Sequence, residues 1–272
     1  GSVSGTGISF GSEAVFYATA GTLPTGASYD SVSSTVGILY NAYTVDQLLC
    51  RIATISGTSV SFGTQTSNLK TSAGNTSIAA ANGKFIVSYR NSSSGGVGQA
   101  IVGVLSGTSI AFGDPQEFSS NSVSFTNLAY NAAAEQIIVS YKDNDSSNDG
   151  VINAGTISGT TISWGSNVTF ASAVGASDTM TTTYDSTSKV VLVAYQNTDN
   201  SNYGTSVLFR SPYTQVDRAE ISNGGNAVIQ TGCAINDTQT GLTAGQQYFV
   251  QTDGTLGLTA GSPSVIAGTA IS

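Results

Sequence analysis

Histidine is absent from this sequence, and its absence removes much of enzyme chemistry. The 272 residues include no His, so the chain lacks the commonest general base, the usual nucleophilic triads and the usual zinc and copper ligands. The two cysteines, Cys50 and Cys233, therefore have no imidazole partner that could activate a thiolate. We expect no catalytic residues and no enzymatic activity.

Charged residues are scarce, and the basic ones are thinly spread. Lys and Arg total 8 against 16 Asp and Glu, which gives a formal net charge of −8. A surface that neutralises phosphates needs clustered Lys and Arg, so we expect no binding to nucleic acid or to anionic lipid. Glycoside cleavage would need a pair of neighbouring carboxylates, and the sequence shows no such cluster.

Long apolar runs and targeting signals are also missing. No run approaches the roughly 20 residues that span a bilayer, so we expect no membrane insertion. No secretory signal is visible and the chain lacks an initiator Met, which indicates a processed or partial product. Cys50 and Cys233 stand far apart in unlike contexts; two separate free thiols are the simpler interpretation, and a bridge between modules is the alternative.

The residues that are abundant favour β-structure. Hydrophobic residues make up 39% of the chain, which is enough for a core, while charged residues make up 9%. Ser, Thr, Asn and Gly supply most of the polarity. Thr and Val fit a pleated strand, and Gly and Asn close tight turns, whereas no stretch has the composition of a long helix.

An internal repeat is the strongest signal in the sequence. The string SGTGISFG recurs three times, and its first glycine returns at steps of 52, 50 and 52 residues. The four copies are Ser4–Gly11, Ser56–Gly63, Ser106–Gly113 and Ser158–Gly165. Apolar runs that end in tyrosine keep the same period, at Tyr40, Tyr89, Tyr141 and Tyr195. Two landmarks in phase over four copies predict four equivalent structural units.

Each unit has room for four short strands, as in a propeller blade. In the fourth unit, TISWGS is followed by expected strands near Val168–Phe170, Thr181–Tyr184, Val190–Tyr195 and Thr205–Phe209. One sheet of this kind cannot bury both faces, so consecutive sheets must stack. We predict an all-β, propeller-like array of four repeats of about 50 residues, with a twisted stack or β-solenoid as the alternative.

The repeat stops after Phe209, and a different pattern follows. GLTAG at Gly241–Gly245 recurs at Gly257–Gly261, each time before an extended run, and Asp253-Gly254 is a predicted hairpin turn. We therefore predict a repeat domain at residues 1–209 and a small β module at residues 210–272.

The C-terminal sequence carries a resemblance to a known class of proteins. The run GLTAGQQYFVQTDGTLGLTAGSPSVIAGTAIS, Gly241–Ser272, resembles a C-terminal segment of tail-fibre and other virion proteins of tailed phages. The repeats, with strings such as SGTSIAFG and VVLVAYQN, resemble repeat regions of the same class. The resemblance implies a protein of the virion surface, trimeric in many such fibres, and it carries no catalytic residues to transfer.

The resemblance, together with the absence of catalytic residues, implies a phage virion protein on the particle surface, with a tail-fibre or receptor-binding component as the first expectation. Its expected partners are a host cell-surface glycan or protein, other virion proteins and further copies of itself, with a trimer as one option. The alternatives are a capsid-decorating or other structural virion protein, a bacterial adhesin or lectin-like module, and a glycan-degrading enzyme. The receptor, the host, the number of blades and the binding face stay open.

One polar loop of the repeats is a candidate ligand-binding site. The string NTDNSNYG offers Asn197, Asp199, Asn202 and Tyr203, whose side chains can hydrogen-bond and stack on a ligand from a rigid scaffold.

The equivalent loop of the preceding repeat is a candidate cation site. In DNDSSNDG, Asp143, Asp145 and Asp149 could supply oxygen ligands to Ca²⁺. The spacing of a calcium loop is not met, so a solvated turn whose side chains bond their own backbone is the other interpretation. We expect no other cofactor.

The repeated tyrosines also allow two interpretations. They could form an array that stacks on sugars, or they could be packing residues with a tethered hydroxyl, as their fixed position at the end of an inner strand favours. Trp164 replaces a phenylalanine of the other repeats and is expected in the core.

Overall fold

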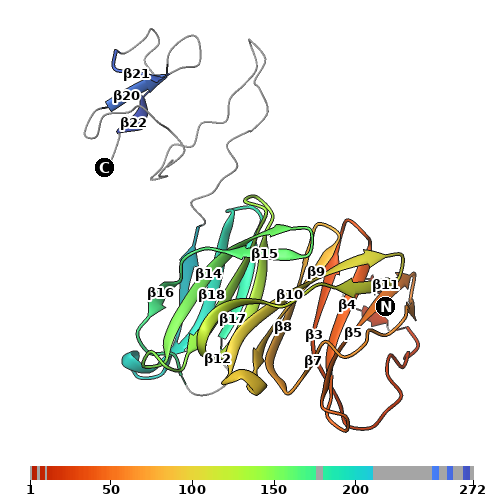
Figure 1. The fold of residues 1–272 in the computed structure, drawn as a ribbon. Coiled ribbons are helices and arrows are strands. Elements are labelled where there is room, and N and C mark those ends of the chain that lie inside the picture. Colours follow the sequence, from red (N-terminus) through yellow and green to blue (C-terminus); the bar gives the residue numbers. More distant parts are fainter. Residues whose placement is uncertain are drawn as a thin grey trace. The chain divides into compact units, whose positions relative to one another are not determined.

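The computed structural model describes residues 2–4, 7–9, 11–175, 180–210, 247–250, 256–259 and 266–269, and within these ranges the chain is built from β-strands. The two helical elements are 3₁₀ turns, Ser92–Ser94 and Thr198–Asn200. Four antiparallel sheets follow one another along the chain between residues 22 and 209, and the second and third share one long strand (Figure 1). The prediction of an all-β, propeller-like array of four repeats is confirmed.

In each sheet the first strands pair in chain order, and in sheets 1 to 3 a strand that follows the closing hairpin returns to pair with the third strand. Sheet 1 consists of β3 (Thr22–Asp30), β4 (Thr35–Ala42), β5 (Gln47–Ser56) and β6 (Ser59–Phe62), with β7 (Lys70–Thr71) also on β5. Sheet 2 consists of β8 (Ala73–Ala81), β9 (Lys84–Asn91), β10 (Val97–Ser106), β11 (Ser109–Phe112) and the first part of β12 (Gln116–Asn131). Sheet 3 consists of the second part of β12, β13 (Gln136–Asp143), β14 (Asp149–Ser158), β15 (Thr161–Trp164) and β16 (Val168–Ala171). Sheet 4 consists of β17 (Met180–Asp185), β18 (Val190–Asn197) and β19 (Tyr203–Phe209).

The sequence repeat is out of step with these sheets. Residues 116–122 of β12 pair with β10 of sheet 2, whereas residues 123–131 pair with β13 of sheet 3. In the same way β16 pairs with β14 of sheet 3, and the chain then crosses to β17 of sheet 4. Our assignment of TISWGS and Thr205–Phe209 to one four-stranded unit is therefore wrong. The SGT motif closes one sheet, and the tyrosine run that follows it belongs to the next.

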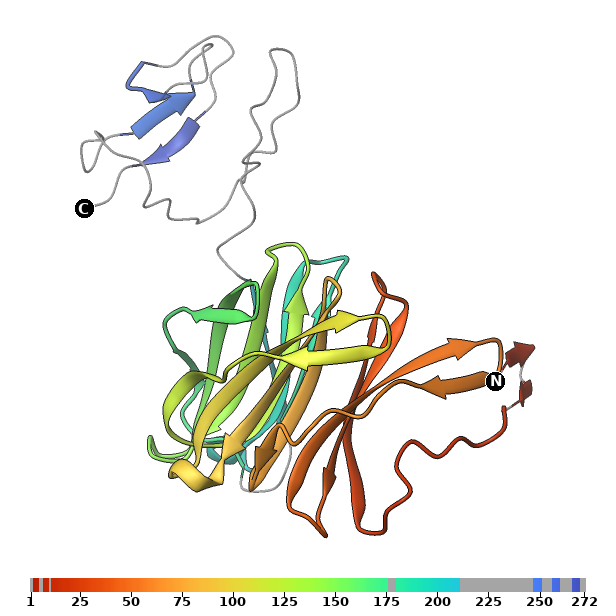
Figure 2. The same ribbon diagram turned by 45° about the vertical axis from the view of Figure 1, so that its right-hand side comes forward.

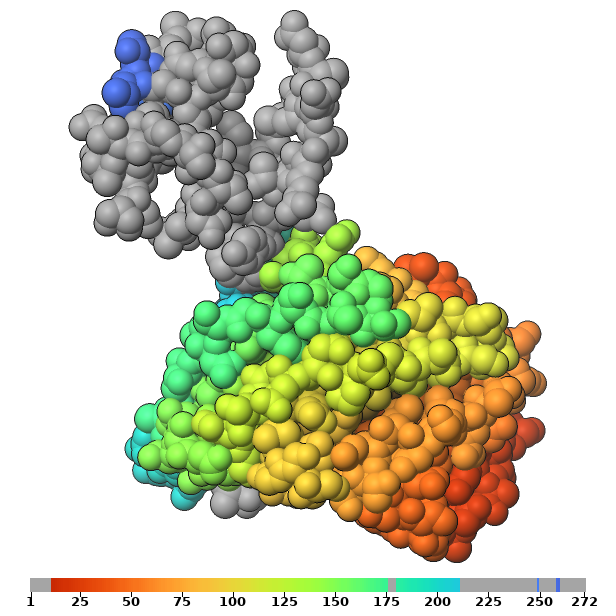
Figure 3. All heavy atoms as spheres, in the orientation of Figure 1, coloured from red at the N-terminus to blue at the C-terminus, as the bar shows by residue number. Residues whose placement is uncertain are grey.

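Apolar side chains fill each interface between consecutive sheets. Between sheets 1 and 2 lie Leu39, Cys50, Ile52, Phe85 and Val87. Between sheets 2 and 3 lie Ile86, Val102, Ile137 and Val139, and between sheets 3 and 4 lie Ile138, Ile152, Val191 and Val193. A middle strand such as β13 is buried along its whole length because a neighbouring sheet covers each of its faces. The sheets appear as successive colour bands in Figure 3.

The tyrosines that end the apolar runs are core residues. Tyr40, Tyr89 and Tyr141 are 0% exposed and Tyr195 is 7% exposed. The packing interpretation is confirmed, and a sugar-stacking array at these positions is ruled out. A phenylalanine ring meets three of them at centroid distances of 5.1–5.2 Å, in the pairs Phe16–Tyr40, Phe118–Tyr141 and Phe170–Tyr195.

The expected tether of the tyrosine hydroxyl is not found in two repeats. The buried hydroxyls of Tyr40 and Tyr89 have no hydrogen-bond partner among the described residues. Loss of contact with water through burial raises the pKa of each to about 12. Trp164 is partly buried against the core of sheets 2 and 3, with its ring 5.6 Å from that of Phe118, as expected of a core position.

Two glycines explain the SGT motif. The glycine after the serine has a φ of 58°, 59° or 62° at Gly57, Gly159 and Gly107, a left-handed conformation that favours glycine in a tight hairpin. The closing glycine allows successive hairpins to touch. A Cβ at Gly63 would lie 1.9 Å from the carbonyl oxygen of Thr108, in the turn of the next hairpin.

Cys50 lies in the core between sheets 1 and 2 and is a free thiol. Burial raises its pKa to about 12, which keeps the thiol protonated and unreactive. Cys233 lies outside the described residues, so the prediction of two separate thiols holds for Cys50 and stays a prediction for its counterpart.

The C-terminal part contains a small antiparallel sheet of β20 (Gln247–Val250), β21 (Leu256–Gly257) and β22 (Ile266–Thr269). The chain separates into two compact units, Gly1–Ser222 and Asn223–Ser272, compared with the boundary we predicted after residue 209. The predicted turn at Asp253-Gly254 lies outside the described residues.

Candidate functional site

Four polar connections lie in a row along one edge of the stacked sheets, which is the lower edge in Figure 1. Each joins the second strand of a sheet to the third. We call them the loop row: residues 43–46, 92–96, 144–148 and 198–202. The row is rich in Ser, Asn and Asp, and it includes the central residues of both candidate loops, whose other candidate residues directly flank it.

Three of the four loops are each held in place by a serine from the chain segment that crosses to the next sheet. These serines, Ser72, Ser122 and Ser172, stand 50 residues apart. The Asp46 carboxylate accepts hydrogen bonds from the Ser72 backbone at 3.2 Å and from its hydroxyl at 2.8 Å. Asp145 accepts from the Ser122 backbone, and Asp199 from the Ser172 hydroxyl, at 2.8 and 2.7 Å. These bonds fix each loop against the chain that enters the next sheet.

The predicted cation loop uses its carboxylates internally. Asp143 is buried and accepts hydrogen bonds from the Asp145 and Ser146 backbones at 3.0 and 3.2 Å and from the Asn121 amide at 2.8 Å. Among the described residues, no group of three His, Cys, Asp or Glu is placed to hold a metal ion. Asp143 and Asp145 therefore form the capped turn that was the other interpretation, while Ca²⁺ binding with Asp149 stays a prediction.

The predicted ligand loop is exposed and ends in an aromatic side chain. Asn197 caps the 3₁₀ turn by accepting from the Asp199 backbone at 3.0 Å. Asp199 bonds Ser172, as described above, and Asn202 has a left-handed φ of 61°. Tyr203 is 62% exposed at the end of this loop. At the other end of the row Tyr43, which was not among the predicted site residues, is 61% exposed.

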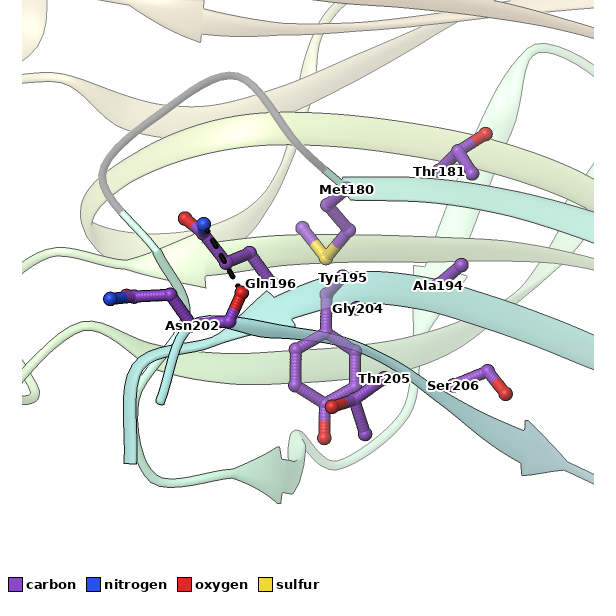
Figure 4. Close-up of a pocket in the computed structure, with 9 residues that line it drawn as sticks. All are labelled: Met180, Thr181, Ala194, Tyr195, Gln196, Asn202, Gly204, Thr205 and Ser206. Atoms are coloured by element: carbon purple, nitrogen blue, oxygen red, sulfur yellow. Dashed lines mark hydrogen bonds between the residues drawn. The ribbon is translucent and has the colours of Figure 1, made fainter. Parts of the chain in front are cut away.

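A shallow hollow of about 690 Å³ lies beside this loop, on the face of sheet 4 that points away from sheet 3. It is lined by Met180, Thr181, Ala194, Tyr195, Gln196, Asn202, Gly204, Thr205 and Ser206. Gln196 closes its loop side with a 3.4 Å hydrogen bond to the Asn202 carbonyl (Figure 4). The lining contains no charged group, so the hollow can offer hydrogen bonds and apolar contacts but no ionic ones.

The composition of the sequence predicted the two loops but neither the hydrogen bonds that fix them nor the hollow. The 50-residue spacing of Ser72, Ser122 and Ser172 could have indicated that these serines have the same role in fixing the loops. The hollow had no such signal, because it depends on which face of sheet 4 is left uncovered.

Comparisons with known proteins add little. No protein-family model matches the chain, and no curated protein matches it. Among solved structures, regucalcin of Agrobacterium tumefaciens strain C58, a calcium-binding protein, is similar over 71% of this chain and 76% of its own, at 10% identity and a TM-score of 0.32. A likeness this distant carries neither calcium binding nor any activity over to this chain. In the part of the chain that the structure describes, no helix has the length and apolar character needed to cross a membrane.

Proposed function

We propose that this chain is a non-enzymatic surface protein of a phage particle, a tail-fibre or receptor-binding component, and that it contacts the host cell through the loop row. Its ligand would be a neutral, polar surface molecule, a glycan first of all. The virion assignment rests on the sequence resemblance of Gly241–Ser272 and of the repeats.

The observation that supports the choice of surface is the fixed loop row with an exposed tyrosine at each end. Saccharide hydroxyls need several hydrogen-bonding groups at fixed positions and an aromatic face to stack on. The row supplies amide, carboxylate and hydroxyl groups, and hydrogen bonds from Ser72 and Ser172 hold its end loops. Tyr43 and Tyr203 supply the aromatic faces. Loops held in this way lose little conformational entropy on binding.

The experiment is a pull-down of the purified chain on intact candidate host cells, followed by titration on the strain that retains it. Tyr203→Ala removes an exposed ring, and Asn202→Ala removes an amide beside it. If Tyr203 is a principal contact, its loss should weaken binding by about tenfold or more, the equivalent of at least ~1.4 kcal/mol. Val104→Ala is the control, since Val104 is also exposed but lies at the hairpin end of sheet 2, away from the loops.

The outcomes separate the candidate functions. Binding that fails with Tyr203→Ala and survives with Val104→Ala supports the proposal. Binding that neither substitution affects places the contact elsewhere. Retention on the phage particle without retention on any host cell would favour a capsid-decorating role instead.

A further inference from the structure

Within the described part of the chain, sheet 4 has an uncovered face and an uncovered edge. In β18, Val191 and Val193 are buried against sheet 3, while Leu192 and Ala194 alternate with them and lie on the opposite face. Among the described residues β19 pairs with β18 alone, whereas β5, β10 and β14 each carry a hairpin strand on their outer side. We call the uncovered surface of sheet 4 the open face: Thr181, Leu192, Ala194, Ser206 and Leu208.

The repeat shows that the open face is built like an internal one. The buried tyrosine of each sheet pairs with a residue of the third strand: Leu49 in sheet 1, Gln99 in sheet 2 and Thr205 in sheet 4. The residues three positions further along that strand are therefore equivalent, and they are Ile52, Val102 and Leu208. Ile52 and Val102 are 0% exposed because the next sheet covers them, whereas Leu208 is 63% exposed. Leu208 thus occupies a position that is core in the other sheets, and no described residue covers it.

Sheet 1 has the matching surface at the opposite end of the stack. The same register makes Ile38 the counterpart of Val87, which is fully buried against the preceding sheet, yet Ile38 is only partly buried. Tyr29, on the same side of sheet 1, is 60% exposed. We call this surface the leading face: Ala27, Tyr29, Val36 and Ile38. Among the residues that the structure describes, Phe16 and Tyr17 cover its Tyr40 end and leave the rest open.

The SGT motifs are offset by one sheet: one copy precedes sheet 1, and none follows sheet 4. Strands β1 (Ser2–Ser4) and β2 (Gly7–Ser9) carry the first SGT motif and, among the described residues, pair only with each other. After β19 the sequence contains no further copy of it. Sheet 4 therefore lacks the SGT hairpin that ends each of the other three sheets. The hairpin β1–β2 has the SGT motif but does not pair with any described sheet. Figure 2 shows this hairpin beside the one formed by β5 and β6. A Cβ at Gly11 would lie 2.1 Å from the Thr58 carbonyl oxygen, the same contact that joins successive hairpins elsewhere.

We propose that the occupant of the open face is a second copy of this chain, bound head to tail. The open face of one copy packs on the leading face of the next, and the second copy's hairpin and following segment line the β19 edge. The contact continues the stacking already present between sheets 1 and 2, 2 and 3, and 3 and 4. It is heterologous, because the two surfaces differ. The hollow on sheet 4 then lies inside the contact, and the loop row stays exposed.

The register of the internal sheets specifies the expected pairing. In sheet 3, Thr169 of β16 pairs with Val151 of β14, and the adjacent Phe170 packs on the tyrosine of the next sheet. Phe16 packs on Tyr40 in the same manner. Its neighbour Val15, which is 73% exposed, is therefore expected to pair with Thr205 of the other copy.

The test is the oligomeric state of the full chain, measured by sedimentation and light scattering over a range of concentrations. The wild-type chain should associate reversibly. Leu208→Asp on the open face and Tyr29→Asp on the leading face should each be monomeric. An equimolar mixture of the two should form a one-to-one dimer, because the mixture retains one intact copy of each surface. Val45→Asp, at an exposed position of the loop row, is the control and should associate like the wild type.

Three results would overturn the proposal. One is a wild-type chain that stays monomeric up to its solubility limit. Another is self-association of Tyr29→Asp at wild-type strength, which would indicate open face against open face. The third is failure of the mixture to form the dimer although both variants keep the wild-type circular dichroism. If Leu208→Asp does not fold, Ser206→Arg on the same exposed strand takes its place. Neither of the two proposed contact surfaces includes the loop row, so failure of this proposal leaves the proposed host contact untouched.

Discussion

The hydroxyls of Tyr40 and Tyr89 are unusual at the scale of single residues. A buried hydroxyl without a hydrogen bond costs free energy, because the unfolded chain hydrates it. The rings are nevertheless well placed, since both side chains are 0% exposed and Phe16 packs on Tyr40. The ring thus stabilises the repeat, while its hydroxyl contributes nothing or opposes folding.

Two substitutions at Tyr89 separate these effects. Tyr89→Phe keeps the ring and removes the unpartnered oxygen, so the free energy of unfolding should stay the same or rise. Tyr89→Ala leaves a cavity between sheets 1 and 2 and should lower it by about 3–5 kcal/mol. Urea denaturation of the three proteins measures both changes. A loss of more than about 1 kcal/mol with Tyr89→Phe would show that the hydroxyl makes a favourable hydrogen bond after all.

Asp30 is a buried carboxylate that joins two sheets. It accepts hydrogen bonds from the Ser33 backbone in its own turn at 2.7 Å and from the Gly83 backbone in sheet 2 at 3.0 Å. Burial acts to raise the pKa of Asp30, but hydrogen bonds from Ser33, Gly83 and Val32 outweigh it and hold the pKa below the ordinary value of 3.8.

Asp30→Ala should therefore destabilise the protein by about 1–3 kcal/mol at neutral pH, because two backbone N–H groups lose their acceptor. Since folding lowers this pKa, the contribution of Asp30 is present above about pH 4 and lost as the pH falls through the folded value. The gap between the wild type and the variant in thermal denaturation should shrink accordingly on acidification. Asp185→Ala is the matched control. Asp185 occupies the same turn of sheet 4 but is exposed, so a smaller change is expected there. An equal effect of the two substitutions would contradict the assigned role of Asp30.

At the scale of elements, local pattern was enough to find the strands but not their partners. The runs that end in Tyr89 and Tyr141 are apolar on both faces, which identified β9 and β13 as inner strands. Nothing in the alternation of β12 shows that it leaves β10 for β13 halfway along, near Ser122. That crossing is set by long-range pairing, and a hydrophobic pattern reports which side chains are buried rather than by which sheet.

The candidate site was predictable to a similar extent. Composition identified the loops at Asp143 and Asn197 because Asn, Asp and Ser favour exposed turns. It did not show that Asp145 and Asp199 are held by Ser122 and Ser172, since those partners lie more than 20 residues away in the chain. Hydrogen bonds over such separations depend on the stacking of the sheets. The carboxylates that suggested a cation site are therefore largely structural.

At the scale of the whole molecule, stacking of repeats predicts a gradient of stability along the chain. In such arrays each repeat is stabilised mainly by its neighbours. Sheets 2 and 3 have a neighbour on both sides, and β13 is buried throughout. Sheet 4 is covered on one side, and every second residue of β17 is exposed. The end of the array should accordingly open more readily than its centre.

Amide hydrogen exchange tests the gradient and the proposed association together. In dilute solution, β9 and β13 should exchange slowest and β19 fastest, because β19 is an edge strand of an end sheet. Raising the protein concentration should slow exchange in β19 and leave β13 unchanged, since a second copy would cover the β19 edge. Leu208→Asp should remove this dependence on concentration. If protection of β19 is the same at all concentrations in the wild type, the second copy binds elsewhere or not at all.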